Sequence, residues 1–102
     1  MARTLDEYRR KLIDKILLAA SPEDALRFSE TAIRSLNDHK VHGYIIVRFI
    51  DKTLFNLEEA AALRIGDRPS QNIKMAIDYF MQVRKKFQNN TVSWLLHDLI
   101  FL

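Results

Sequence analysis

The chain has no cysteine, and its 102 residues include only two glycines and two prolines. Without cysteine it forms no disulfide framework and offers no thiolate ligand to zinc. All-β domains need turn residues every ~8–12 positions, and glycine and proline supply many of them. Their scarcity argues against an all-β fold and leaves a helical fold as the first expectation.

Long apolar runs are also missing. No run approaches the roughly 20 residues that span a bilayer, and the N-terminal segment MARTLDEYRRKLIDK has no apolar centre of the signal-peptide kind. We therefore expect a cytoplasmic protein without a membrane partner. Hydrophobic residues make up 48% of the chain and charged residues 28%, which suits one folded core better than disorder. The length predicts a single domain over residues 1–102.

Signals of helix starts occur at two points in the first third of the chain. Thr4 and Glu7 have the spacing of a capping box, and apolar residues follow them at helical intervals. Ser21 followed by Pro22 is typical of a second start, because serine caps a helix and proline suits its first position. Asn37 suits a left-handed exit from this second helix.

A third helix is expected over about residues 39–64, with Asp38 as its cap. It contains the run YIIVRFI (44–50), whose β-branched residues, taken alone, are also compatible with a strand. The following DKTLFNLEEAAAL is rich in helix formers and contains no turn signal, so we prefer a helix. A helix that is apolar on nearly all sides belongs at the centre of a bundle or in an interface.

The remaining sequence predicts two more helices. Gly66 is expected to end the third helix, and Ser70 is expected to cap a fourth. The run NNT (89–91) is expected to break the fourth helix, so that VSWLLHDLIFL forms a fifth. The predicted fold class is therefore all-α, a single-domain helical bundle of about five helices.

The histidines are the candidates for metal chemistry. His39 and His42 share one helix face at i and i+3, but zinc needs at least three protein ligands, which His97 and Asp98 would have to complete. The Glu-x-x-His pairs of di-iron bundles do not occur. There is also no cysteine nucleophile, G-x-S-x-G elbow or glycine-rich phosphate loop. We expect no metal, cofactor or enzymatic activity, and a metal-dependent hydrolase is the third hypothesis.

The net charge of +3 is unevenly distributed and includes two short basic clusters. The clusters consist of Arg9, Arg10 and Lys11 in the first helix and Arg84, Lys85 and Lys86 in the fourth. If these helices are neighbours, their outer faces could merge into a surface for phosphate backbones. Acidic residues punctuate both clusters, however, and no aromatic base-stacking pattern accompanies them. Accessory nucleic-acid binding is therefore the alternative function.

Surplus apolar residues support a different first hypothesis. Phe55 falls on the solvent side of the third helix, and Met81 falls among charged residues of the fourth. Trp94, Phe101 and Leu102 lie outside the stripe that one core covers on the last helix. Burying one such side chain contributes about 1.5–3 kcal/mol, and a second copy of the chain is the nearest cover. We therefore expect a non-enzymatic protein–protein interaction module that forms a homodimer or binds another protein. Phe55 and these three residues are its expected interface, and the homodimer is the preferred arrangement.

Overall fold

Helices make up most of the chain. The computed structural model describes residues 4–63 and 68–101, and it describes their side chains as far as Phe87. These residues form four α-helices and no strand: α1 (Leu5–Leu18), α2 (Pro22–Asp38), α3 (Gly43–Ala62) and α4 (Arg68–Phe101). The all-α fold is confirmed. The expected count of about five helices is wrong by one, because residues 89–91 lie inside α4 and do not break it.

The first two helices begin where their capping residues predict. The Thr4 hydroxyl accepts a hydrogen bond from the Glu7 N–H at 3.1 Å. The Ser21 hydroxyl accepts one from the Asp24 N–H at 3.2 Å. Each cap satisfies one of the amides that a helix start leaves without an intrahelical partner. Because these interactions are local, they can be predicted from the sequence.

The end of α2 differs from the expectation. The helix continues through Asn37 to Asp38, so Asp38 does not cap α3. The chain turns at Lys40, which has a positive φ of 56°. The Val41 N–H then donates to the Leu36 carbonyl at 3.0 Å, the long-range bond of a Schellman motif. The left-handed exit therefore occurs three residues later than predicted.

His42, not Asp38, caps α3. Its Nδ1 accepts a hydrogen bond from the Tyr44 N–H at 3.2 Å. As a result α3 spans Gly43–Ala62, which is shorter than the expected range of 39–64. The run YIIVRFI is helical, so the strand alternative is wrong. Its β-branched residues cost little in helix propensity compared with burying an apolar side of α3.

α4 begins earlier and ends later than its sequence signals suggest. Pro69 and Ser70 already lie in its first turn, so Ser70 does not precede the helix as a cap. Proline is tolerated there because first-turn amides have no intrahelical acceptor. Residues 89–91 have lower helix propensity than alanine, by up to ~0.7 kcal/mol each, but none is glycine or proline, so the helix continues. Gly66, the expected end of the third helix, lies outside the described residues.

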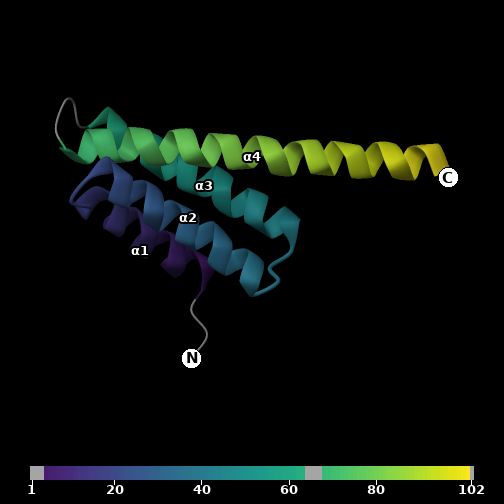
Figure 1. Ribbon diagram of the computed structural model, residues 1–102, viewed down its shortest axis with the longest axis horizontal. Helices are drawn as coiled ribbons and strands as arrows, with labels where there is room; N and C mark the ends of the chain where they lie inside the picture. The colour runs from purple at the N-terminus through teal and green to yellow at the C-terminus, as the bar shows by residue number, and fades with distance from the viewer. Residues whose placement is uncertain (1–3, 64–67, 102) are drawn as a thin grey trace.

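The helices pack with α1 and α3 running in one direction and α2 and α4 in the other (Figure 1). α2 and α3 both pack against α4, and α1 contacts the other three helices. α2 and α3 are consecutive in sequence but barely touch, so they lie diagonally across the bundle. The side chains at the centre are fully buried, and the largest of them are Phe80, Ile16, Ile46, Ile50, Leu57 and Ile73.

The contacts of α4 divide it into two parts. Phe87 lies beside the first residue of α3, where a methyl group on Gly43 would meet its ring at 3.9 Å. Beyond this point α4 continues past the ends of all the other helices (Figure 1). We call residues 4–63 and 68–87 the body and residues 88–101 the α4 extension. At 1.5 Å per residue the extension is about 21 Å long.

Candidate functional site

The outer side of α3 carries two exposed aromatic residues. Phe55 is 62% exposed, which agrees with its expected position on the solvent side, and Tyr44 is 64% exposed. Arg48 and Lys52 lie between them and are also exposed. We call Tyr44, Arg48, Lys52 and Phe55 the α3 stripe. Tyr44 was not singled out in the sequence, although three helical turns separate it from Phe55 and so place both on one side.

Shallow hollows lie between the α3 stripe and α1. One of 260 Å³ is bordered by Leu5 and Ile45, which are 37% and 40% exposed, and by Tyr44. Another of 270 Å³ is bordered by Phe55 and Arg9, and Arg9 also borders a third of 380 Å³. The surface between α1 and α3 is therefore indented at several points. Apolar side chains border the hollows beside Tyr44 and Phe55, whereas the third hollow is lined mainly by charged residues.

An ionic network connects α1 to the α3 stripe. The Arg9 Nη1 donates to Asp6 at 2.8 Å, and its Nε donates to the Asn56 amide oxygen at 3.0 Å. Lys52 Nζ lies 4.0 Å from the same Asp6 oxygen. The hydrogen bond and charge of Arg9, with a further contribution from Lys52, lower the pKa of the Asp6 carboxyl. Asp6 therefore stays ionised and offsets part of the positive charge at this surface.

The first members of the two basic clusters lie on opposite borders of α3, and each is paired with a carboxylate. Arg9 pairs with Asp6 on the α1 side. On the α4 side, Arg84 donates to Asp51, which raises the pKa of the Arg84 guanidinium. Both arginines therefore stabilise contacts within the body.

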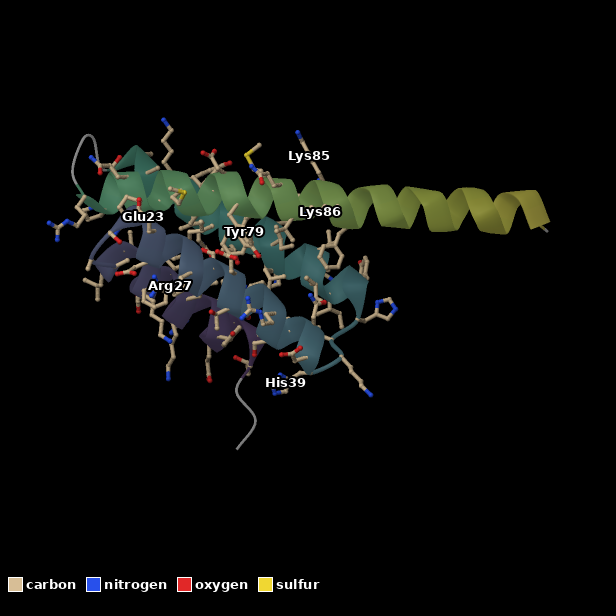
Figure 2. All side chains as sticks on the ribbon, in the orientation of Figure 1. Glu23, Arg27, His39, Tyr79, Lys85 and Lys86 are labelled. Carbon is tan, nitrogen blue, oxygen red and sulfur yellow. The ribbon has the colours of Figure 1, made fainter. Side chains whose placement is uncertain are left out.

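The other cluster members point in several directions. Lys11 borders a small cleft between α1 and α2. Arg10 borders a hollow together with Asp14. Lys85 points away from the other helices (Figure 2), and Lys86 is also exposed. The structure therefore does not gather the six residues into one group.

Three of the four expected interface residues belong to the C-terminal end of the chain. Trp94 and Phe101 lie in the α4 extension, whose backbone is helical and whose side chains are outside the described set. Leu102 lies outside the described residues. Met81, in the body part of α4, is 49% exposed, as its position among charged residues predicts.

Both described histidines have structural positions at helix ends. His39 follows α2 and its Nδ1 lies 2.8 Å from the Ser35 carbonyl oxygen, at the lower end of α2 in Figure 2. His42 caps α3. Within the described residues, no group of three or more His, Cys, Asp or Glu side chains is arranged to hold a metal ion. The side chains of His97 and Asp98, the other expected ligands, are outside the described set.

The buried polar side chains also serve the fold. The Ser29 and Thr53 hydroxyls donate to the carbonyls one turn earlier, at 2.9 and 2.7 Å. Asn72 donates from Nδ2 to the Ala19 carbonyl at 2.9 Å and so connects the end of α1 to the start of α4. The Asn72 Oδ1 is buried and has no hydrogen-bond partner within the described residues.

None of the helices is apolar enough over a sufficient length to cross a membrane, as far as the described residues extend. Comparisons of the chain with protein-family models, curated proteins and solved structures find no match.

Proposed function

We propose that this chain is a non-enzymatic protein–protein interaction module that forms a homodimer. The α4 extension is the main support, because it continues past every other helix of the body (Figure 1). Its sequence has few polar residues after Thr91. Its apolar residues are Val92, Trp94, Leu95, Leu96, Leu99, Ile100 and Phe101. A helix of this composition is stable when other protein surface covers it.

The energy involved favours association. Burying one large apolar side chain contributes about 1.5–3 kcal/mol, whereas a small domain has a total stability of about 5–15 kcal/mol. A second copy supplies cover without a further gene product, and a two-fold axis gives both copies the same environment. Tyr44 and Phe55 add support because they are exposed in the single chain. Aromatic residues that become buried on association are enriched at the centres of interfaces.

The non-enzymatic part of the proposal rests on the residues present. The chain has no cysteine nucleophile and no glycine-rich phosphate loop, and His39 and His42 are occupied as helix caps. No catalytic residue, metal or cofactor is assigned. A cytoplasmic location belongs to the same proposal, since a chain without cysteine suits a reducing compartment.

Sedimentation equilibrium over 1–100 µM tests the proposal. We expect about twice the chain mass for the wild type and a shift toward the single-chain mass for Trp94→Glu. Removal of Phe101 and Leu102 is expected to act in the same direction. Met81→Glu is the matched control, since it places the same charge on exposed α4 surface within the body. A wild type that remains a single chain at every concentration would contradict the proposal.

Accessory nucleic-acid binding is the second candidate function. It is favoured by the exposed Lys85 and Lys86, which form no ion pair within the described residues. It is weakened by the pairing of Arg9 with Asp6 and of Arg84 with Asp51, which engages one arginine in each cluster. Binding to phosphates would then depend on the remaining cations.

A further inference from the structure

The α3 stripe has the dimensions of a binding surface for one short helix. Its apolar ends, Tyr44 and Phe55, are separated by about 16 Å at 1.5 Å per residue. The α4 extension, at about 21 Å, is long enough to cover both ends. Leu5 and Ile45 widen the apolar surface beside Tyr44. The length and apolar character of the two surfaces therefore match.

The charges of the two surfaces are complementary. Arg48 lies over the Tyr44 ring at 5.9 Å and forms no ion pair within the described residues. Lys52 is 4.0 Å from Asp6, a carboxylate that Arg9 already contacts at 2.8 Å. The middle of the stripe is therefore positive.

The extension has the opposite sign. Asp98 is the one formally charged residue between Phe87 and the end of the sequence, with His97 taken as neutral. An extension laid on the stripe would therefore bring negative charge to Arg48 and Lys52.

We infer that the α4 extension of one copy lies along the α3 stripe of the other copy, and that the two copies exchange extensions reciprocally. This inference rests on the proposed homodimer and specifies its interface. α3 and α4 run in opposite directions within one chain (Figure 1). A two-fold axis perpendicular to α4 makes the partner's extension antiparallel to α4 and therefore parallel to α3.

The parallel direction sets an alignment between the two helices. The partner's extension leaves its own body near the start of α3 and proceeds toward Phe55. Because both helices rise by the same 1.5 Å per residue, residue 98 is then level with Lys52 when residue 101 is level with Phe55. Residue 94 is level with Arg48. This alignment therefore puts the one charged residue of the extension level with a cation of the α3 stripe.

Direct pairing of two parallel extensions is the competing arrangement, and two observations argue against it. It puts the two Asp98 residues at the same level on adjacent helices, where like charges repel. It also leaves Tyr44 and Phe55 in water, at 64% and 62% exposure. Reciprocal exchange covers both the α4 extension and the α3 stripe in each copy, whereas the parallel pairing covers only the extension.

Cysteine cross-linking tests the alignment cleanly because the natural chain has no cysteine. A chain carrying Arg48→Cys is mixed with a chain carrying Ser93→Cys, and a bis-maleimide with a short spacer is added. We expect a strong heterodimeric product. Arg27→Cys mixed with Ser93→Cys is the matched control: Arg27 is an exposed arginine on α2, diagonally across the bundle from α3. This control pair is expected to give little product.

A charge exchange supplies a second measurement that does not depend on cross-linking. Asp98→Lys and Lys52→Asp are each expected to weaken dimerisation about two- to fivefold, the range of an exposed ion pair. Combining both changes in one chain is expected to restore most of the affinity. A simple loss of apolar contact would not show this recovery. Both positions are on helix surfaces or outside the body, so each variant retains the core.

Each outcome has a defined meaning. The inference is supported by a cross-linked dimer between positions 48 and 93 together with recovery of dimer affinity in the variant that combines Asp98→Lys with Lys52→Asp. A dimer that instead links Ser93→Cys to itself overturns the inference and leaves the proposed homodimer intact. A single-chain species overturns both. If a chain carrying both cysteines then links internally, the extension folds back onto its own α3.

Discussion

The two halves of α4 differ in how their sequence relates to their surroundings. In the body, Ile73, Ala76 and Phe80 are fully buried, and Lys74 and Asp78 on the same helix are exposed. In the α4 extension, apolar residues occupy most positions after Thr91, and the helix passes beyond its neighbours (Figure 1). One continuous helix thus combines an amphipathic half with a half that is mainly apolar.

The contrast between the two parts of α4 suggests different roles for them: the body part folds the chain, and the extension is the part proposed to associate with a second copy. A helix that packs against one core needs an apolar stripe of about 100°, and the body half of α4 has such a stripe. Apolar residues beyond that stripe do not help a single body to fold. They are favourable only when another surface covers them. The stability of the fold is therefore expected to depend on the body, and the proposed association on the α4 extension.

Removing the α4 extension tests most directly whether the body folds without it, and it has the largest expected effect on the mass in solution. A chain ending at Phe87 retains every buried core residue named above, so its cooperative thermal unfolding by circular dichroism should persist. Its mass by sedimentation equilibrium should be that of one chain at every concentration. A truncated chain that loses its cooperative transition would show that the extension belongs to the core.

Two adjacent residues of α4, Phe80 and Met81, test the packing of the body without the extension. Phe80 is fully buried, so Phe80→Ala should lower the free energy of unfolding by about 3–5 kcal/mol through lost burial and a residual cavity. Met81 is 49% exposed, so Met81→Ala should change it by less than about 0.5 kcal/mol. Urea titration of both variants in the truncated background removes any contribution from association. Equal effects would mean that α4 does not pack in the described orientation.

The sequence predicted the features that depend on local interactions. The starts of α1 and α2 were predicted because Thr4 and Ser21 bond amides three residues away. The exposure of Phe55 and Met81 was predicted because helical periodicity places them among charged residues. The all-α class followed from the same periodicity.

The errors arose where local signals compete. Asp38 and His42 both offer cap acceptors, and the choice depends on where α2 can close its last turn at Lys40. The run of Asn89 to Thr91 resembles a helix break, yet contains no residue that prevents helical hydrogen bonds. The direction of each basic residue depends on which helices are neighbours, and this was not accessible from the sequence. The proposed role of Trp94, Phe101 and Leu102 stays a prediction.

A smaller effect is expected at the turn between α2 and α3. Lys40 has a φ of 56°, a conformation that costs a non-glycine residue roughly 1–2 kcal/mol. Lys40→Gly removes this cost but adds freedom to the unfolded chain worth about 0.4–1 kcal/mol. We expect a net stabilisation of about 0.5–1 kcal/mol, measured by urea titration. Since the turn belongs to the body, the dimer dissociation constant should not change; a changed constant would place the turn in the interface.

The weakest effect is expected in nucleic-acid binding. This binding also distinguishes the body from the α4 extension, because only the body contains the basic clusters. Every cation of the two basic clusters is in the body, and the extension contains none. With Arg9 and Arg84 paired to carboxylates, Arg10, Lys11, Lys85 and Lys86 remain as contacts for phosphate. On duplex DNA, four phosphate contacts predict that the logarithm of the binding constant falls linearly with the logarithm of the salt concentration. The magnitude of this slope should not exceed about 3.6. We therefore expect weak binding without sequence preference.

Fluorescence anisotropy with a labelled duplex at several salt concentrations measures this slope. Lys85→Glu combined with Lys86→Glu should reduce its magnitude by about two, because each lost phosphate contact removes about 0.9. The chain truncated after Phe87 should bind like the wild type, since it retains all four cations. Tight binding at physiological salt that disappears in the Lys85→Glu/Lys86→Glu variant would make nucleic-acid binding the primary function. Binding that instead disappears on truncation would show that dimerisation joins the clusters of two copies into one surface, and the two regions would then act together.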